Sequence, residues 1–194
     1  PINTKKSKIV FDDGECFALY KGEIRRLDIE IGREIGEEEY YTTIYPTLKK
    51  RAFARLLYIL EISFKSENDI IKKLRLSFYP DEVIKEAIEK AVKFGYIDDE
   101  RYTKRYVATY KDKYSKLKLK YKLMEKGINK EIIENALEEA YIDESPKIKR
   151  LLEKKHYFET DEFEKKQKII ASIMRQGYKY TEIKDIINDI STEI

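Results

Sequence analysis

The sequence is poor in the side chains that metal sites and covalent catalysts use most. Its 194 residues contain one cysteine, Cys16, and one histidine, His156. A single cysteine excludes an internal disulfide, which fits a cytoplasmic setting, and a His/Cys zinc site cannot be built. A Ser-His-Asp arrangement would have to use His156, which follows Lys154 and Lys155 on a predicted helix face. We therefore expect no catalytic residues, no metal and no cofactor.

Long apolar runs are missing as well. No stretch of about 18 apolar residues occurs, so the sequence predicts no membrane-spanning helix. The first six residues are not followed by the apolar core of a signal peptide, and we expect a cytoplasmic protein. Apolar residues still make up 42% of the chain, enough for a buried core, while 40% are charged, far above the roughly 25% of globular domains. This composition is typical of narrow helical modules with much solvated surface.

Positive charge is abundant overall but concentrated in one segment. The formal net charge is only +3, yet residues 101–130 contain eleven basic residues and two acidic ones, so the rest of the chain is net acidic. A local basic surface attracts polyanions, most commonly phosphate backbones. A solvated lysine-rich helix face is the alternative, but such faces usually carry interleaved acids. The predicted nucleic-acid-binding residues are Arg101, Lys104, Arg105, Lys111, Lys113, Lys116, Lys118, Lys120, Lys122 and Lys126.

The N-terminal 36 residues predict β-structure. Asp13-Gly14 lies between the apolar runs 9–11 and 16–20, which is a strong hairpin signal. Alternating apolar residues at 24–31 predict a third strand. Helical periodicity begins near Glu37, is expected to break at Pro46, and continues from Thr47 onward.

From there the sequence repeats with a period of about 50 residues. Superposing Leu74, Leu123 and Ile173 aligns apolar or turn residues in five further columns: Ile70/Leu119/Ile169, Phe78/Gly127/Gly177, Tyr79/Ile128/Tyr178, Ile84/Ile133/Ile183 and Ile88/Leu137/Ile187. Each copy reads as a helix, a tight turn and a helix, preceded by a further helix. The predicted fold is mainly α, with three tandem three-helix bundles in an elongated, curved arrangement. The expected boundaries are 1–36 for the β segment, 37–99, 100–144 and 145–194 for the repeats.

Two motifs in the second repeat allow more than one interpretation. Asp98 and Asp99 could serve acid–base or metal chemistry, but they directly precede a helix and are better explained as a structural cap in the linker. Tyrosines recur every four residues at Tyr102, Tyr106, Tyr110 and Tyr114, interleaved with basic residues. Such rings stack on bases or pack in a core. The drift of about 40° per step predicts the first two in the core and the last two at the surface.

The alternation of lysine with apolar residues over 116–123 would suit a strand, but the repeat register favours a helix. A helix-turn-helix reader is the other possibility for this region, with a turn at 126–129. Its recognition helix, starting at Lys130, would be acidic and would repel phosphates. Reading of base sequence in a major groove is therefore disfavoured.

The motifs of the second repeat resemble those of one known family. The string Gly95-Tyr96-Ile97-Asp98-Asp99-Glu100-Arg101-Tyr102, followed by Leu123-Met124-Glu125-Lys126-Gly127-Ile128, is similar to the RecX regulatory family. Ile132-Ile133 continue this match. Lys65-Ser66 resembles a segment of the family's first repeat, and Met174-Arg175-Gln176-Gly177-Tyr178 resembles one of its third. The whole resemblance covers about residues 50–190. The β segment resembles that of extended Gram-positive members. Departures are Thr103 for alanine, Lys65 for arginine and Ser115 near an expected glycine.

The resemblance implies a regulatory protein without enzymatic activity. Such proteins lie in the groove of the RecA–DNA filament and alter its ATPase, strand exchange and stimulation of LexA cleavage, in homologous recombination, DNA repair and the SOS response. The implied partners are the RecA filament and single-stranded DNA, with double-stranded DNA as a further candidate, and a monomer is expected. The alternative is a protein that binds single- or double-stranded DNA directly, without RecA contact.

Overall fold

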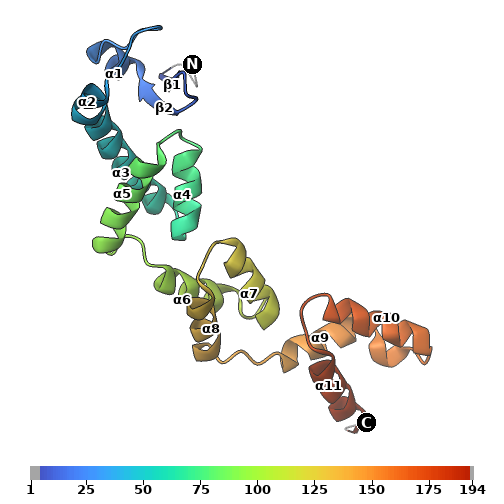
Figure 1. The fold of residues 1–194 in the computed structure, drawn as a ribbon. Coiled ribbons are helices and arrows are strands. Elements are labelled where there is room, and N and C mark those ends of the chain that lie inside the picture. The colour runs from blue at the N-terminus through green and yellow to red at the C-terminus, as the bar shows by residue number, and fades with distance from the viewer. Residues whose placement is uncertain (1–4, 193–194) are drawn as a thin grey trace. The chain divides into compact units, whose positions relative to one another are not determined.

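The computed structural model describes residues 5–192, which form helices apart from one small sheet (Figure 1). The chain folds into two compact units, the first ending at Asp98 and the second starting at Asp99. Within the described residues, helices pack in three groups of three, and a two-stranded sheet precedes them. The predicted mainly helical fold, with three-helix repeats and a small N-terminal hairpin, is confirmed.

The hairpin forms where the sequence predicts it. Strands β1 (Lys6–Val10) and β2 (Cys16–Tyr20) pair antiparallel, with Val10 opposite Cys16 at the turn. Gly14 has φ of +90°, a backbone conformation that favours glycine, and this lets the chain reverse. Phe17 and Leu19 are fully buried in the core of the first unit. The helices therefore stabilise a hairpin that would be marginal alone.

The predicted third strand over residues 24–31 is wrong. Residues Lys21–Arg26 form helix α1 instead, because Glu23 secures its first turn. The carboxylate of Glu23 accepts a 2.9 Å hydrogen bond from the Tyr20 backbone N–H and a 2.7 Å bond from Arg51 Nε. Ile24 and Leu27, three residues apart, then share the helix face that packs on the core.

Pro46 does not interrupt the following helix, contrary to prediction. Helix α2 (Glu37–Glu39) continues through a π-helical turn, η1 (Tyr40–Ile44), into α3 (Tyr45–Ile62). A proline lacks a backbone donor and its ring crowds the carbonyl four residues earlier. The wider π turn directly before Pro46 changes the hydrogen-bonding frame at that point, so the helix axis continues.

The three repeats follow in order along the chain. Repeat one consists of α3 with α4 (Glu67–Arg75) and α5 (Asp81–Lys93). Repeat two consists of α6 (Asp99–Tyr110), α7 (Lys116–Glu125) and α8 (Lys130–Glu139). Repeat three consists of α9 (Ser145–Lys154), α10 (Phe163–Met174) and α11 (Tyr180–Thr192), with a short 3₁₀ turn, η2 (Tyr157–Glu159), after α9.

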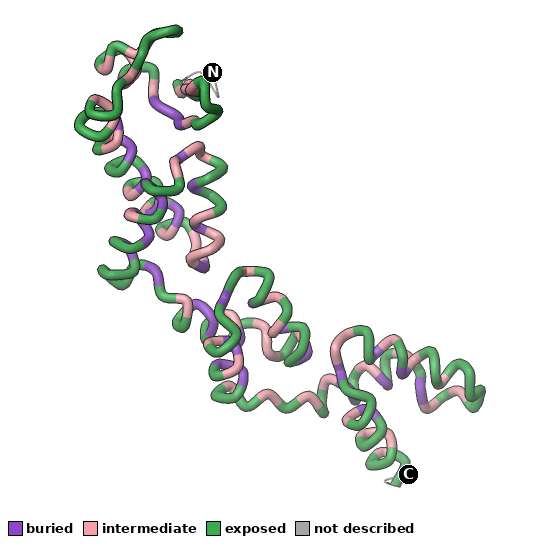
Figure 2. The backbone as a smooth tube through the Cα atoms, viewed as in Figure 1, coloured by how far each residue is buried: buried purple, intermediate pink, exposed green. Residues whose placement is uncertain are grey.

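The structure agrees with the repeat register. Leu74, Leu123 and Ile173 are each completely buried, and Figure 2 shows buried positions recurring along the helices of each repeat. The turn column is occupied by Phe78, Gly127 and Gly177, whose φ angles are +61°, +77° and +96°. All three copies thus end the second helix with a left-handed residue, and repeat one does so without glycine.

His156 does not lie on a helix face, contrary to prediction. It follows the end of α9 with φ of +58°, and its Nδ1 atom is 2.8 Å from the Glu159 carboxylate at the surface. Asp98 directly precedes α6 and is exposed, while Asp99 and Glu100 occupy the first turn of that helix. Their role as a cap stays a prediction.

Within residues 5–192, no helix combines the length and the apolar character needed to span a bilayer. The same residues include no cluster of three or more histidine, cysteine or acidic side chains arranged to hold a metal ion.

Candidate nucleic-acid interface in the second repeat

The ten predicted binding residues do not form one continuous surface. All lie on α6, on α7, in the turn between them or at the end of α7, but two side chains bind acids of the adjacent helix α8. Lys104 forms a 2.8 Å ion pair with Glu139, and Lys120 forms a 2.7 Å ion pair with Glu134. The Lys120 hydrogen bond lowers the pKa of the Glu134 carboxyl. These two lysines are therefore engaged inside the repeat.

The four tyrosines form a continuous ladder. Ring centroids are 6.1 Å apart for Tyr102 and Tyr106, 4.6 Å for Tyr106 and Tyr110, and 5.6 Å for Tyr110 and Tyr114. Tyr102 is buried, as predicted, while the other three are half-buried. The prediction that Tyr106 belongs to the core is thus met only in part. Burial raises the pKa of its hydroxyl, and the nearby Lys126 ammonium opposes the shift.

A row of lysines on α7 lines this ladder. The Nζ atoms of Lys118 and Lys122 lie 5.0 and 5.3 Å from the Tyr114 ring centroid, and Lys113 from the preceding turn lies 5.5 Å away. At the other end, Lys126 lies 5.9 Å from the Tyr102 ring. We call this surface the tyrosine–lysine strip; it comprises Tyr102, Tyr106, Tyr110, Tyr114, Lys113, Lys118, Lys122 and Lys126.

The strip concentrates positive charge around one ring. Within residues 5–192 the ammonium groups of Lys113, Lys118 and Lys122 form no ion pair with a carboxylate. Three like charges that converge on Tyr114 repel one another, and the cation–π contacts offset only part of that cost at an exposed site. An anion such as a phosphate would relieve the repulsion, so the geometry suits a phosphate backbone that passes along half-buried aromatic rings.

The sequence did not indicate which lysines share a face. The alternating set 116–122 looked like one group, but helical spacing of about 100° per residue separates its members. Lys118 and Lys122, four residues apart, join the strip, while Lys120 turns to Glu134. Spacing alone would have linked Lys118, Lys122 and Lys126. It could not have shown that this row faces the tyrosines.

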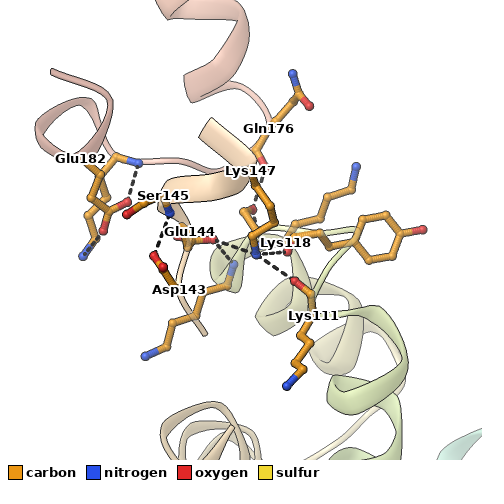
Figure 3. Close-up of polar contacts among 12 residues, drawn as sticks. Lys111, Lys118, Asp143, Glu144, Ser145, Lys147, Gln176 and Glu182 are labelled. Carbon is orange, nitrogen blue, oxygen red and sulfur yellow. Dashed lines mark hydrogen bonds and ion pairs between the residues drawn. The ribbon is translucent and has the colours of Figure 1, made fainter. Parts of the chain in front are cut away.

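A buried polar joint connects repeats two and three, and sequence reasoning missed it (Figure 3). Ser115 caps α7 by accepting a 3.2 Å hydrogen bond from the Lys118 N–H, and its hydroxyl donates a 2.7 Å bond to the Gln176 carbonyl. Lys147 donates to the Lys111 and Tyr114 carbonyls at 2.8 and 3.0 Å. The turn that carries the end of the tyrosine ladder is thus held by the third repeat.

Glu144 completes the joint. Its carboxylate accepts a 2.7 Å hydrogen bond from the Lys116 N–H and lies 3.9 Å from Lys147 Nζ. Burial is the main cause that raises the pKa of Glu144 and lowers the pKa of Lys147, although the attraction between the two opposes both shifts. A buried ion pair is weak evidence for stability, so the role that these contacts support is positional: they hold the turn before α7 against the third repeat.

These features define a protein of tandem three-helix repeats with a basic, tyrosine-lined second repeat. Residues 98–137 match the family model described as RecX, second three-helix domain. The chain is 32% identical to the "Regulatory protein RecX" of Clostridium acetobutylicum, over 90% of this chain and 80% of that protein. It is 31% identical to the same-named protein of Caldanaerobacter subterraneus, over 95% and 94%. The chain belongs to the RecX family.

Solved structures show the same fold. The crystal structure of RecX from Lactobacillus salivarius superposes with a TM-score of 0.66 at 24% identity, covering 76% of this chain and 99% of that one. Another crystal structure of regulatory protein RecX superposes with a TM-score of 0.68 at 23% identity, covering 94% of each chain.

Proposed function

We propose that this chain regulates a RecA recombinase by binding to the RecA filament on single-stranded DNA, and that it acts by binding and not by catalysis. Its relatives are named as regulatory proteins, which supports a regulatory role. In this proposal the bound protein lowers the ATPase, strand-exchange and coprotease activities of RecA, because it favours one state of a filament that must cycle between states.

The tyrosine–lysine strip is the observation that carries the DNA part of this proposal. Lys113, Lys118 and Lys122 neutralise successive phosphates, and counterion release from the DNA supplies most of the electrostatic free energy. As these ammonium groups turn toward phosphates, they leave the face of Tyr114, which then becomes available to a base. Stacking of this kind tolerates any base, which suits a regulator that acts along a whole filament.

A second candidate function is direct DNA binding without RecA contact. The strip favours it to the same degree, since any phosphate backbone would relieve the charge around Tyr114. The two functions differ in what they predict for bare DNA. A protein that binds DNA alone gains nothing from RecA on the strand, whereas a filament regulator gains protein contacts in addition.

The affinity for filaments and for bare DNA separates the two functions. We expect binding to RecA–single-stranded DNA filaments to be at least about tenfold tighter than binding to the same oligonucleotide without RecA, a difference of about 1.4 kcal/mol. Fluorescence anisotropy with a labelled strand, at one fixed salt concentration, measures both, and a duplex of the same sequence is measured alongside. Equal affinities for filament and bare strand would favour the second function.

A further inference from the structure

Helix α7 exposes a stripe of apolar side chains on a face that the strip does not use. Leu117, Tyr121 and Met124 are 45%, 57% and 47% exposed. They are spaced by four and three residues and so lie within an arc of about 60°. Leu119 and Leu123, which are completely buried, occupy the opposite side of the helix. We call Leu117, Tyr121 and Met124 the apolar stripe.

The equivalent faces of the other two repeats are more polar. With the 49-residue spacing of the repeat, the same positions in α4 are Asn68, Lys72 and Arg75. With the 50-residue spacing, they are Gln167, Ala171 and Met174 in α10. A solvent-facing helix face normally resembles that of α4. Leu117 lies against Gly177 of the third repeat, because a Cβ atom built on that glycine would be 3.3 Å from the Leu117 Cβ. The repeat architecture does not require apolar residues at Tyr121 and Met124, and another constraint must account for them.

The charges that border the stripe are mostly positive. Lys116 and Lys120, four residues apart, border one side of the stripe, where Lys120 already pairs with Glu134, and Lys118 of the strip borders the other side. Within α7, the acidic residue is Glu125 at its C-terminal end. A partner surface that complements this face has an apolar centre and carboxylates at its rim. Nucleic acid fits it less well, because two of the three side chains, Leu117 and Met124, do not stack on bases as the ring of Tyr121 can.

We propose that the apolar stripe docks on the protein component of the filament, on an apolar patch of the recombinase that is rimmed by carboxylates. This inference rests on the proposed function, to which it adds the protein contact. Lys118 and Lys122 of the strip lie about 90–130° from the middle of the stripe around the same helix. One ten-residue helix thus faces DNA on one side and protein on another. Simultaneous contact makes the second interaction effectively intramolecular, which favours the nucleoprotein complex over either component alone.

The test replaces Tyr121 and Met124 with glutamine, which keeps helix propensity and removes the apolar surface. We expect the affinity for RecA–single-stranded DNA filaments to fall at least about tenfold, while the affinity for bare single-stranded DNA stays within about twofold. The matched control replaces Tyr58 and Ile62 with glutamine. These are two exposed apolar residues four positions apart on α3, and their replacement should leave both affinities unchanged. A Tyr121→Phe/Met124→Leu variant, which keeps the stripe apolar, should retain filament binding and shows that α7 tolerates changes there.

Each other outcome overturns the docking surface. Retained filament binding by the glutamine variant shows that the stripe contacts nothing there. Parallel losses for filament and bare DNA place the stripe in the DNA site. A wild-type dimer that light scattering detects, and that the glutamine variant loses, assigns the stripe to a second copy of this chain. If the wild-type protein shows no preference for filaments over bare DNA, the proposed function itself is refuted. If the wild type shows the preference and the glutamine variant keeps it, only the docking surface is refuted.

Discussion

Replacing Lys113, Lys118 and Lys122 together with glutamine should weaken binding to single-stranded DNA and to the RecA filament at least about tenfold at moderate salt. The three ammonium groups converge on Tyr114 without a carboxylate partner within residues 5–192, so a phosphate is the counter-charge they suit. Because each lost phosphate contact lowers the salt slope of log affinity by about 0.7 for single strands, the slope should fall by about 2. Titration at several salt concentrations measures both quantities.

A control with the same charge change distinguishes a site from general attraction. Lys149, Lys154 and Lys184 are exposed on repeat three, and their replacement with glutamine should lower affinity much less. Equal losses in the two triple variants would mean that net charge alone governs binding. No loss in the strip variant would mean that the strip does not contact DNA.

Gly177→Ala should destabilise the protein by about 2–4 kcal/mol, the largest stability effect that we expect from a single added methyl group. Gly177 has φ of +96°, so a side chain there costs about 1–2 kcal/mol from backbone strain alone. A Cβ atom would also lie 2.5 Å from Ser115 Oγ, in the middle of the joint between repeats two and three. Urea unfolding followed by circular dichroism measures the change in the free energy of unfolding.

Gly95→Ala is the matched control for this prediction. Gly95 also has a left-handed φ, +70°, but a Cβ atom there meets nothing within 4 Å, so only the strain of about 1–2 kcal/mol is expected. Ser115→Ala alone should cost about 1–3 kcal/mol, because both the cap of α7 and the bond to the Gln176 carbonyl are lost. The Ser115→Ala/Gly177→Ala double variant should lose less stability than the two single variants together, because Ser115 Oγ, the atom that crowds the new Cβ, is absent. Strict additivity would show that the two residues are not in contact.

The features that the sequence predicted well depend on local patterns. The Asp13-Gly14 turn locates the hairpin, and the recurring column of Phe78, Gly127 and Gly177 locates the end of the second helix in every repeat. Each of these signals depends only on the residues of the turn itself and not on distant contacts. The helix over 116–123 was predicted against its alternating pattern because Leu119 and Leu123 matched equivalent residues in other copies, and both are completely buried.

Features that depend on distant contacts were missed. Residues 24–31 alternate as a strand would, but Glu23 accepts hydrogen bonds from the Tyr20 backbone N–H and from Arg51 of α3, and both support the helical turn that begins at Tyr20. Pro46 predicted a break, but a π turn has no marker in composition. The first error arose because a tertiary contact overrides local propensity, and the second because residue types do not reveal the hydrogen-bonding frame of a π turn.

For the candidate site, the sequence indicated the basic repeat but not the arrangement of its side chains. Charge counting located the basic repeat, yet the sequence could not separate Lys118 from Lys120, because which face of α7 meets the tyrosines depends on how α6 and α7 pack. The joint carried no signal at all. The Ser115 hydroxyl bonds to the backbone carbonyl of Gln176, 61 residues away, and any residue offers that carbonyl. Lys147 looked like one more surface lysine, although its side chain is only 12% exposed.

The most direct test of a filament regulator is the ATPase activity of RecA on single-stranded DNA as this protein is titrated in. We expect the rate to fall saturably, and the strip and stripe variants to need at least about tenfold more protein for the same effect, matching their losses in affinity. The two control variants, at repeat three and at α3, should behave like the wild type. A RecA ATPase rate that stays unchanged, at protein concentrations that saturate the DNA, would contradict the central claim.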